Sequence, residues 1–145
     1  MGRGWFGVVK FRIAKFIQPE KNCSDRAVLV AISIPIFTSQ LEKSREAVDL
    51  ANIRAAYAEV MTTALTGDKK NSGNVKYDNA SNTYTYTVTL KQTKDDWQTT
   101  MTDVEIGGVA STAFVNTPKA NGTATVSYKE GTATTDGTVT ITFVQ

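Results

Sequence analysis

Acidic side chains gather between residues 95 and 105, where they could supply oxygen ligands to a cation. Asp95, Asp96, Asp103 and Glu105 all lie in this short stretch, and Ca²⁺ takes about six to eight oxygen ligands in proteins. Their spacing matches no defined calcium loop, and acids beside Trp97 among polar residues are typical of an exposed turn. We therefore predict a plain turn here and no bound metal.

Hydroxyl side chains are plentiful, but the groups that would activate them are missing. The chain has no histidine and a single cysteine, Cys23, so it lacks the commonest general base and cannot form an internal disulfide. It contains no Gly-x-Ser-x-Gly turn, no Ser-x-x-Lys pair in a suitable context and no glycine-rich phosphate loop. We expect no enzymatic activity and no cofactor.

The composition gives no reason to propose a nucleic-acid partner. The chain has 145 residues, a formal charge of +2 and 21% charged residues, which is ordinary for one globular domain. Basic and aromatic residues are concentrated in residues 1–26. These residues are predicted to be a leader, and the alternative is a short amphipathic helix on an anionic membrane surface.

An apolar run occupies residues 27–37 and contains Pro35. A helix needs about 20 apolar residues to cross a bilayer, so this run of 11 residues is not expected to cross one by itself. Ser24 or Asp25 is a natural N-cap for a helix that starts at residue 27. Pro35 removes a backbone N–H and its ring clashes with the preceding turn, so a kink is predicted there.

A long amphipathic helix is predicted to follow and to end at Gly67. Its apolar residues fall into two stripes, which implies two packing partners. The alanine-rich stripe permits the close approach of another helix, and the bulkier stripe suits a sheet of the same chain. The first comprises Leu41, Val48, Ala51, Ala55, Ala58 and Leu65, and the second comprises Leu50, Ile53, Tyr57, Val60, Met61 and Ala64.

Charged side chains occupy the rest of this helix. Arg45 lies three residues after Glu42 and four before Asp49, spacings at which opposite charges stabilise a helix by about 0.2–0.5 kcal/mol per pair. We expect these residues to form a solvated face with ordinary ion pairs.

Alternating, threonine-rich segments make up the remainder of the chain. Residues 84–90, 124–128 and 139–143 place apolar side chains on one face and mainly threonines on the other, and residues 101–106 are a weaker fourth candidate. Turn-forming residues separate the segments, and those at 129–137 are predicted to close a hairpin. Alternation indicates a sheet with one buried face, and the bulky helix stripe is its only available cover.

The predicted fold is therefore α+β, with a long N-terminal helix, kinked near Pro35, packed on a C-terminal antiparallel sheet of about four strands. Residues 1–26 form the atypical leader, residues 27–67 a helical stalk and residues 68–145 a β head. Residues 27–145 are expected to be one structural unit.

Residues 28–47, Val-Leu-Val-Ala-Ile-Ser-Ile-Pro-Ile-Phe-Thr-Ser-Gln-Leu-Glu-Lys-Ser-Arg-Glu-Ala, resemble the second half of the stalk of type IV pilins and pseudopilins. In that family an apolar helix ends in Ala-Ile-Pro and continues as an amphipathic helix that packs on an antiparallel sheet. The resemblance extends to about Gly67. At its start the sequence departs from the family, because neither the prepilin cleavage motif nor the first half of the apolar helix is recognisable there.

The resemblance implies a structural subunit of a type IV pilus-like surface filament, with the β head outward. Two alternatives remain open: a pseudopilin of a secretion or DNA-uptake system, and a monomeric extracellular binding module. Expected partners are further copies of the chain and an assembly machinery, with a membrane contact through residues 1–37. The expected location is the cell surface, after an initial stay in the inner or cytoplasmic membrane.

The residues expected to carry the structural function fall into two sets. The assembly interface comprises Val28, Leu29, Ile32, Ile34, Pro35, Ile36, Phe37, Leu41, Val48, Ala51 and Ala55. The helix-to-sheet core comprises Leu50, Ile53, Tyr57, Val60 and Met61.

Overall fold

The computed structural model describes the backbone of residues 22–71 and 73–145, with side chains from residue 34 onward. Two units make up the chain, Met1–Ile34 and Pro35–Gln145, and the tertiary contacts given below lie within the second. The helix α1 (Asn22–Thr66) contains Pro35 and continues through it. The kink predicted at Pro35 concerns the boundary between the two units and stays a prediction.

The helix begins earlier than its sequence pattern suggested. It starts at Asn22, so Ser24 and Asp25 lie inside it and the predicted N-cap is wrong. Apolar periodicity could not locate this end, because polar residues in a first helical turn carry no such pattern.

The helix ends at the position predicted from Gly67. Gly67 has a φ of +67°, a left-handed conformation that costs glycine little. Its N–H donates to the carbonyl of Ala64, and the N–H of Asp68 donates to the carbonyl of Thr63. These two bonds form a Schellman motif and give partners to carbonyls that a helix end leaves without one.

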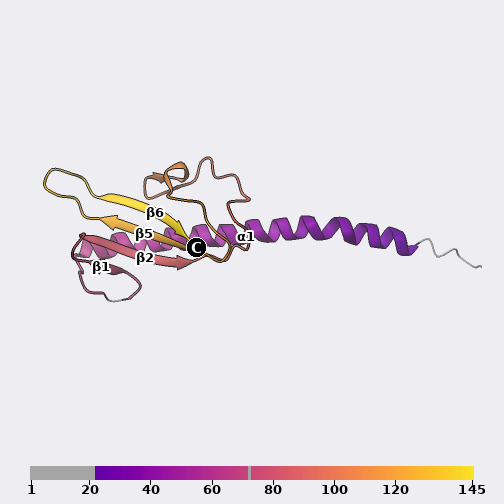
Figure 1. Ribbon diagram of the computed structural model, residues 1–145, viewed down its shortest axis with the longest axis horizontal. Helices are drawn as coiled ribbons and strands as arrows, with labels where there is room; N and C mark the ends of the chain where they lie inside the picture. Colours follow the sequence, from indigo (N-terminus) through magenta and orange to yellow (C-terminus); the bar gives the residue numbers. More distant parts are fainter. Residues whose placement is uncertain (1–21, 72) are drawn as a thin grey trace, which may run out of the picture. The chain divides into compact units, whose positions relative to one another are not determined.

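A four-stranded antiparallel sheet follows α1, in the spatial order β1-β2-β5-β6. The strands are β1 (Lys76–Asp78), β2 (Thr83–Thr89), β5 (Thr123–Lys129) and β6 (Thr138–Val144). Figure 1 shows β5 and β6 joined by a long hairpin, and the three long strands are those that the alternation predicted. The α+β class and the antiparallel sheet are thus confirmed.

The fourth strand is not the predicted one. Residues 101–106 contribute only β3 (Glu105–Ile106), which pairs with β4 (Val109–Ala110) in a separate two-stranded sheet. Gly107 and Gly108, with φ of +60° and +81°, make the turn between them, as a tight hairpin requires. A short 3-10 helix, η1 (Ser111–Ala113), follows. The edge position belongs to β1, which is too short to show an alternating pattern.

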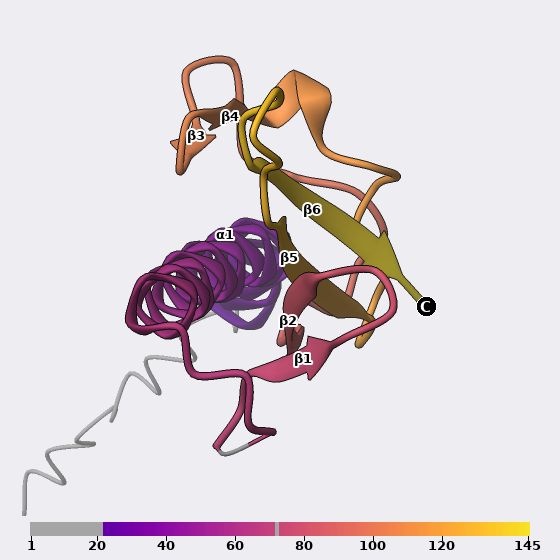
Figure 2. The same ribbon diagram turned by 90° about the vertical axis from the view of Figure 1, so that its left-hand side faces the viewer.

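The core of the second unit lies between α1 and the sheet, and Figure 2 shows the helix lying along one face of the strands. The helix contributes Leu50, Ile53, Ala56 and Val60, and the long strands contribute Tyr84, Ala124, Val126, Ile141 and Phe143. On neighbouring strands Tyr86 is opposite Val126, which is in turn opposite Ile141. Alternation therefore places the large residues on one face of these strands against the helix.

Candidate functional site

The described part of α1 carries two different rows of side chains on opposite sides. At 3.6 residues per turn, positions that recur at spacings of three and four lie on one side of a helix. One such row is buried and comprises Glu42, Glu46, Asp49, Ile53, Ala56 and Val60. The other is exposed and comprises Phe37, Leu41, Ser44, Val48, Ala51, Ala55, Ala58, Thr62 and Leu65. We call the exposed row the seam and the three buried acids the acid row.

The acid row holds an irregular segment, residues 91–99, against the helix. Both oxygens of Asp49 accept from the N–H of Lys91, at 2.7 and 2.9 Å, and one of them also accepts from the N–H of Gln92, at 2.9 Å. Glu46 accepts from the N–H groups of Gln98 and Thr99, at 2.6 and 2.9 Å. Beyond the end of β2, these carboxylates thus take the place of a neighbouring strand as hydrogen-bond acceptors for the backbone N–H groups.

Glu42 completes the acid row. It accepts from the N–H groups of Thr93 and Lys94 and from the Thr93 hydroxyl, and it forms an ion pair with Arg45 at 3.0 Å. Burial acts to raise the pKa of Glu42, but the hydrogen bonds from Thr93, Lys94 and Arg45 outweigh it and lower the pKa below its ordinary value. Bonds that favour the charged form have this effect.

These contacts correct the prediction of a solvated charged face. The Glu42–Arg45 pair forms as predicted, but Glu42 and Asp49 are buried and bind backbone instead of standing in solvent. A signal was present in the spacing, because the acid row continues the line of Ile53, Ala56 and Val60 towards the N-terminus. A buried row that changes from apolar to acidic indicates that the helix leaves the sheet and meets loop backbone.

We expect replacement of Glu42 by glutamine to lower the free energy of unfolding by about 1–3 kcal/mol at pH 7, since an amide cannot accept all of these bonds. The pKa of Glu42 is lowered from 4.5 on folding, so its carboxylate stabilises the fold above that value and loses the effect as the pH falls through the folded pKa. The difference between the two proteins should therefore shrink below pH 4.5. Urea unfolding at several pH values measures it, and a difference that stays constant down to pH 3 would contradict the assignment.

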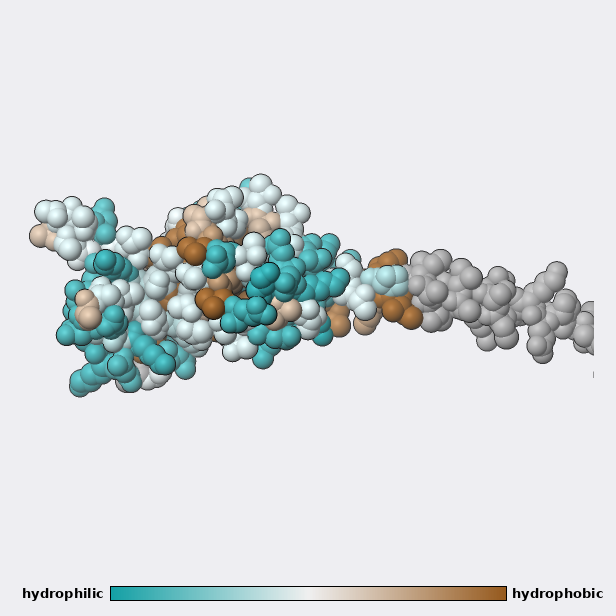
Figure 3. All heavy atoms as spheres, viewed as in Figure 1, coloured by the Kyte–Doolittle hydropathy of each residue, from teal (hydrophilic) through white to brown (hydrophobic). Residues whose placement is uncertain are grey.

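The seam is exposed along its whole length. Phe37 is 72% exposed, Val48 49% and Leu65 82%, and no position in the row carries a charge. The Thr62 hydroxyl donates to the carbonyl of Ala58, so this polar group is satisfied within the helix. Figure 3 shows brown, hydrophobic surface on the helix at the start of the described side chains. Such a long, uncharged and largely apolar exposed face is unusual for an isolated soluble domain.

The predicted assembly residues within the described side chains are all exposed. Ile34, Pro35 and Ile36 stand in solvent together with the seam members Phe37, Leu41, Val48, Ala51 and Ala55. Val28, Leu29 and Ile32 lie outside the residues whose side chains are described. The same holds for residues 1–33 of the membrane contact predicted through residues 1–37. The structure therefore places eight of these eleven side chains on the surface.

The predicted helix-to-sheet residues divide by depth. Leu50, Ile53 and Val60 are buried, and Tyr57 is partly buried against the core. A Cβ on Gly107 would lie 2.2 Å from the Tyr57 ring, so this glycine lets the β3–β4 turn approach the helix. Met61 is half-buried. Ala56 is buried and was missed, because it was not assigned to either stripe.

The acidic turn at residues 95–97 is held by contacts within the protein. Asp95 accepts from the N–H of Ala120 and pairs with Lys119 at 3.0 Å, and Trp97 packs edge-on against Phe143. Within the described residues no group of three or more Cys, Asp or Glu side chains could hold a metal ion.

A second cluster of hydrogen-bonded polar side chains lies at the other end of the sheet. Glu130 pairs with Lys69 at 2.9 Å and accepts from the hydroxyl of buried Tyr84 at 3.3 Å. The Tyr77 hydroxyl donates to Asn82 at 2.8 Å. The hydrogen bond from Lys69 lowers the pKa of Glu130. Each group has a partner inside the protein, so the cluster is structural.

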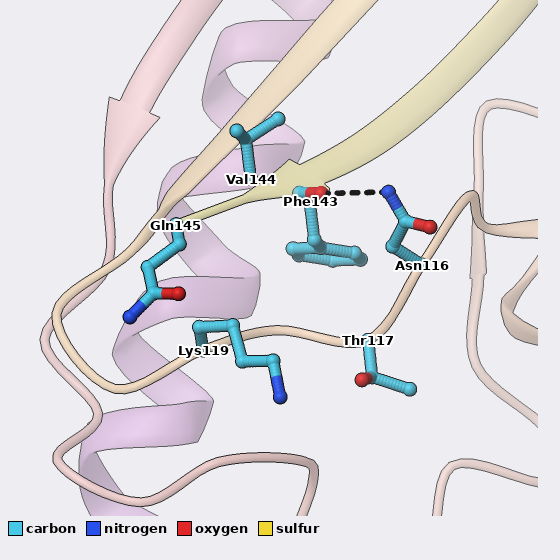
Figure 4. Close-up of a pocket in the computed structure, with 6 residues that line it drawn as sticks. All are labelled: Asn116, Thr117, Lys119, Phe143, Val144 and Gln145. Carbon is cyan, nitrogen blue, oxygen red and sulfur yellow. Dashed lines mark hydrogen bonds between the residues drawn. The ribbon is translucent and has the colours of Figure 1, made fainter.

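An open hollow lies at the end of β6, and Figure 4 shows the side chains that line it. Asn116, Thr117, Lys119, Phe143, Val144 and Gln145 surround it. Two of its polar groups are already occupied, since the Asn116 amide donates to the Phe143 carbonyl at 3.1 Å and Lys119 pairs with Asp95. Thr117 and Gln145 are its other polar side chains, so the hollow offers few polar groups to a ligand.

In the part of the chain that the structure describes, no helix combines the length and hydropathy needed to cross a membrane. No protein-family model, no curated protein and no solved structure matches the chain. The seam, opposite the acid row and the core, is the feature from which a function can be argued.

Proposed function

We propose that the chain is a structural subunit of a type IV pilus-like surface filament that assembles through its helix and carries the β head outward. The observation that supports this function is the seam, an uncharged and largely apolar helix face that stays exposed across residues 37–65. The head packs on the opposite side of the helix, so the seam is free to meet other subunits.

The energetics favour burial of the seam against further protein. Full burial of a side chain such as Phe, Leu or Val is worth about 1.5–3 kcal/mol, and four large side chains of this kind stand on the seam. Ala51, Ala55 and Ala58 between them permit the close approach of a neighbouring helix. The partners in this proposal are copies of the chain and an assembly machinery, and the location is the cell surface.

Replacing Val48 or Ile34 with aspartate should abolish assembly and leave the head folded. Each change places a charge on an exposed helix face that assembly would bury, whereas neither side chain belongs to the core. Sedimentation without detergent measures assembly, and circular dichroism with urea unfolding measures the fold.

The matched control is Lys43→Asp, which also introduces an exposed acid on the same helix but lies off the seam. It should assemble like the unmodified protein. Filaments that persist in the Val48 and Ile34 variants would overturn the proposal. An unmodified protein that stays monodisperse and monomeric would favour the alternative, a monomeric extracellular binding module.

A pseudopilin of a secretion or DNA-uptake system would use the same helix face. The surface filament is our proposal, and the pseudopilin is its alternative. Short, machinery-dependent assemblies would favour the pseudopilin, and long filaments formed at the cell surface would favour the pilus subunit.

A further inference from the structure

Three asparagines stand in the acceptor motif for N-linked glycans, Asn-x-Ser or Asn-x-Thr with x other than proline. The motifs are Asn22-Cys-Ser, Asn79-Ala-Ser and Asn121-Gly-Thr. The side chain of Asn22 lies outside the described ones. A motif this short also occurs by chance, so the surroundings of Asn79 and Asn121 decide whether either one can accept a sugar.

The hydrogen bonds of the β head single out the same two residues. Residues 68–145 contain six asparagines. Four of them use the side-chain amide in hydrogen bonds with Tyr77, Glu59 or Phe143, namely Asn71, Asn74, Asn82 and Asn116. Asn79 and Asn121 make no side-chain hydrogen bond with another described residue. Their amides are therefore free to react without the loss of a contact that holds the fold.

The backbone around Asn121 makes it a poor acceptor in the folded head. Asn121 has a φ of +54°, and its N–H donates to the carbonyl of Gln92 at 2.9 Å. The next residue, Gly122, is buried, and its carbonyl accepts from the N–H of Leu90 at 2.8 Å. A transferase has to surround the asparagine and the hydroxyl two residues later, and here residues 90–92 occupy that space.

Asn79 lies instead in the turn between β1 and β2, where residues 78–82 are all exposed. The Asp78 carboxylate holds the turn, because it accepts from the N–H of Ala80 and from the hydroxyl of Ser81. Both groups that define the motif, the Asn79 amide and the Ser81 hydroxyl, are thus on the surface. The turn belongs to the sheet, which packs on the side of α1 opposite the seam, so a glycan at Asn79 would leave the seam uncovered.

We propose that Asn79 is an N-glycosylation site of the β head. The donor is an oligosaccharide on a polyprenyl phosphate or diphosphate, and a membrane-bound oligosaccharyltransferase catalyses the transfer. The Nδ2 atom of Asn79 bonds to C1 of the first sugar while the bond from C1 to the phosphate oxygen breaks. The lipid phosphate leaves with the electron pair of that bond, and Nδ2 loses one proton to a base of the transferase. The inference rests on the proposed function only for the location, because the transferase and its donor act on chains that cross or leave a membrane.

Peptide mass spectrometry of the chain isolated from the surface of the cells that produce it tests the site. The peptide that contains Asn79 should carry the mass of a glycan, and an amidase that releases N-linked glycans should leave aspartate at this position. Asn79→Gln and Ser81→Ala should each lose the glycan completely. Ser81→Thr should keep it, since threonine supplies the same hydroxyl.

Asn121→Gln is the matched control, because it removes the other described motif and should leave the glycan in place. Urea unfolding should give Asn79→Gln the stability of the unsubstituted chain, since Asn79 is exposed. An unmodified Asn79 in chain taken from the cell surface would overturn this inference and leave the filament proposal standing, as would a glycan that persists in Ser81→Ala. A chain found only inside the cell would overturn both.

Discussion

Replacing Asp49 with alanine is expected to lower the free energy of unfolding by about 3–4 kcal/mol. Asp49 is 0% exposed, and its carboxylate accepts from the backbone N–H groups of Lys91 and Gln92. Alanine would leave both donors without a partner beside the helix. Each unpaired donor in a water-poor environment costs about 1–3 kcal/mol, and the hydrogen bonds to the charged acceptor are lost as well.

Urea unfolding at pH 7 measures this effect, and Lys43→Ala is the matched control on the same helix. Lys43 is exposed, so its replacement should change the free energy of unfolding by less than about 0.5 kcal/mol. Asparagine at position 49 keeps one oxygen acceptor and should give an intermediate loss. Equal stability of the Asp49→Ala and Lys43→Ala proteins would show that the acid row does not hold the 91–99 segment.

Much of the fold follows from patterns that are local in the sequence. The alternation in residues 84–90, 124–128 and 139–143 predicted the three long strands, because a strand buried on one face must alternate. The turn-rich residues 129–137 predicted the hairpin between β5 and β6, and Gly67 predicted the helix end. The bulky stripe predicted burial of Leu50, Ile53 and Val60, since a helix with one apolar stripe must cover it.

The acid row depends on contacts that no local pattern encodes. Glu42, Glu46 and Asp49 meet backbone groups about fifty residues further along the chain, and hydrogen bonds to backbone donors place no demand on the side chains of residues 91–99. Carboxylates on a helix usually lie in solvent. The residue types of the acid row therefore predicted exposure, whereas the structure buries these side chains. Only their position in line with Ile53 indicated burial.

The short length of β1 explains why the sequence pattern did not identify it as the fourth strand. The edge strand β1 has three residues, and only Tyr77 among them points to the core, so alternation could not identify it. Residues 101–106 look more like a strand, but they turn back at once: the N–H of Val104 donates to the carbonyl of Met101, and the Ser111 hydroxyl donates to the same carbonyl. Turn contacts of this kind outweigh a weak alternating pattern.

The two sides of α1 carry separate tasks in the proposed function, and that separation has a direct consequence for mutations. The buried row fixes the head to the helix through apolar contacts at Ile53 and through backbone binding at Asp49. The seam contributes nothing to the core of the subunit. Changes on one side should therefore affect stability, and changes on the other should affect association.

Replacing Ile53 with alanine is expected to lower the free energy of unfolding by about 3–4 kcal/mol, because a fully buried isoleucine loses its apolar contacts and leaves a cavity. Val48→Ala on the same helix should cost less than about 1 kcal/mol, since Val48 is 49% exposed and alanine favours helix. Urea unfolding of dilute, unassembled protein separates the two. Sedimentation should give the opposite order, with Val48→Ala weakening association more than Ile53→Ala under conditions where both are folded. Equal costs in unfolding would contradict the assignment of the two helix faces, because a partly exposed side chain cannot contribute as much to the core as one that water does not reach.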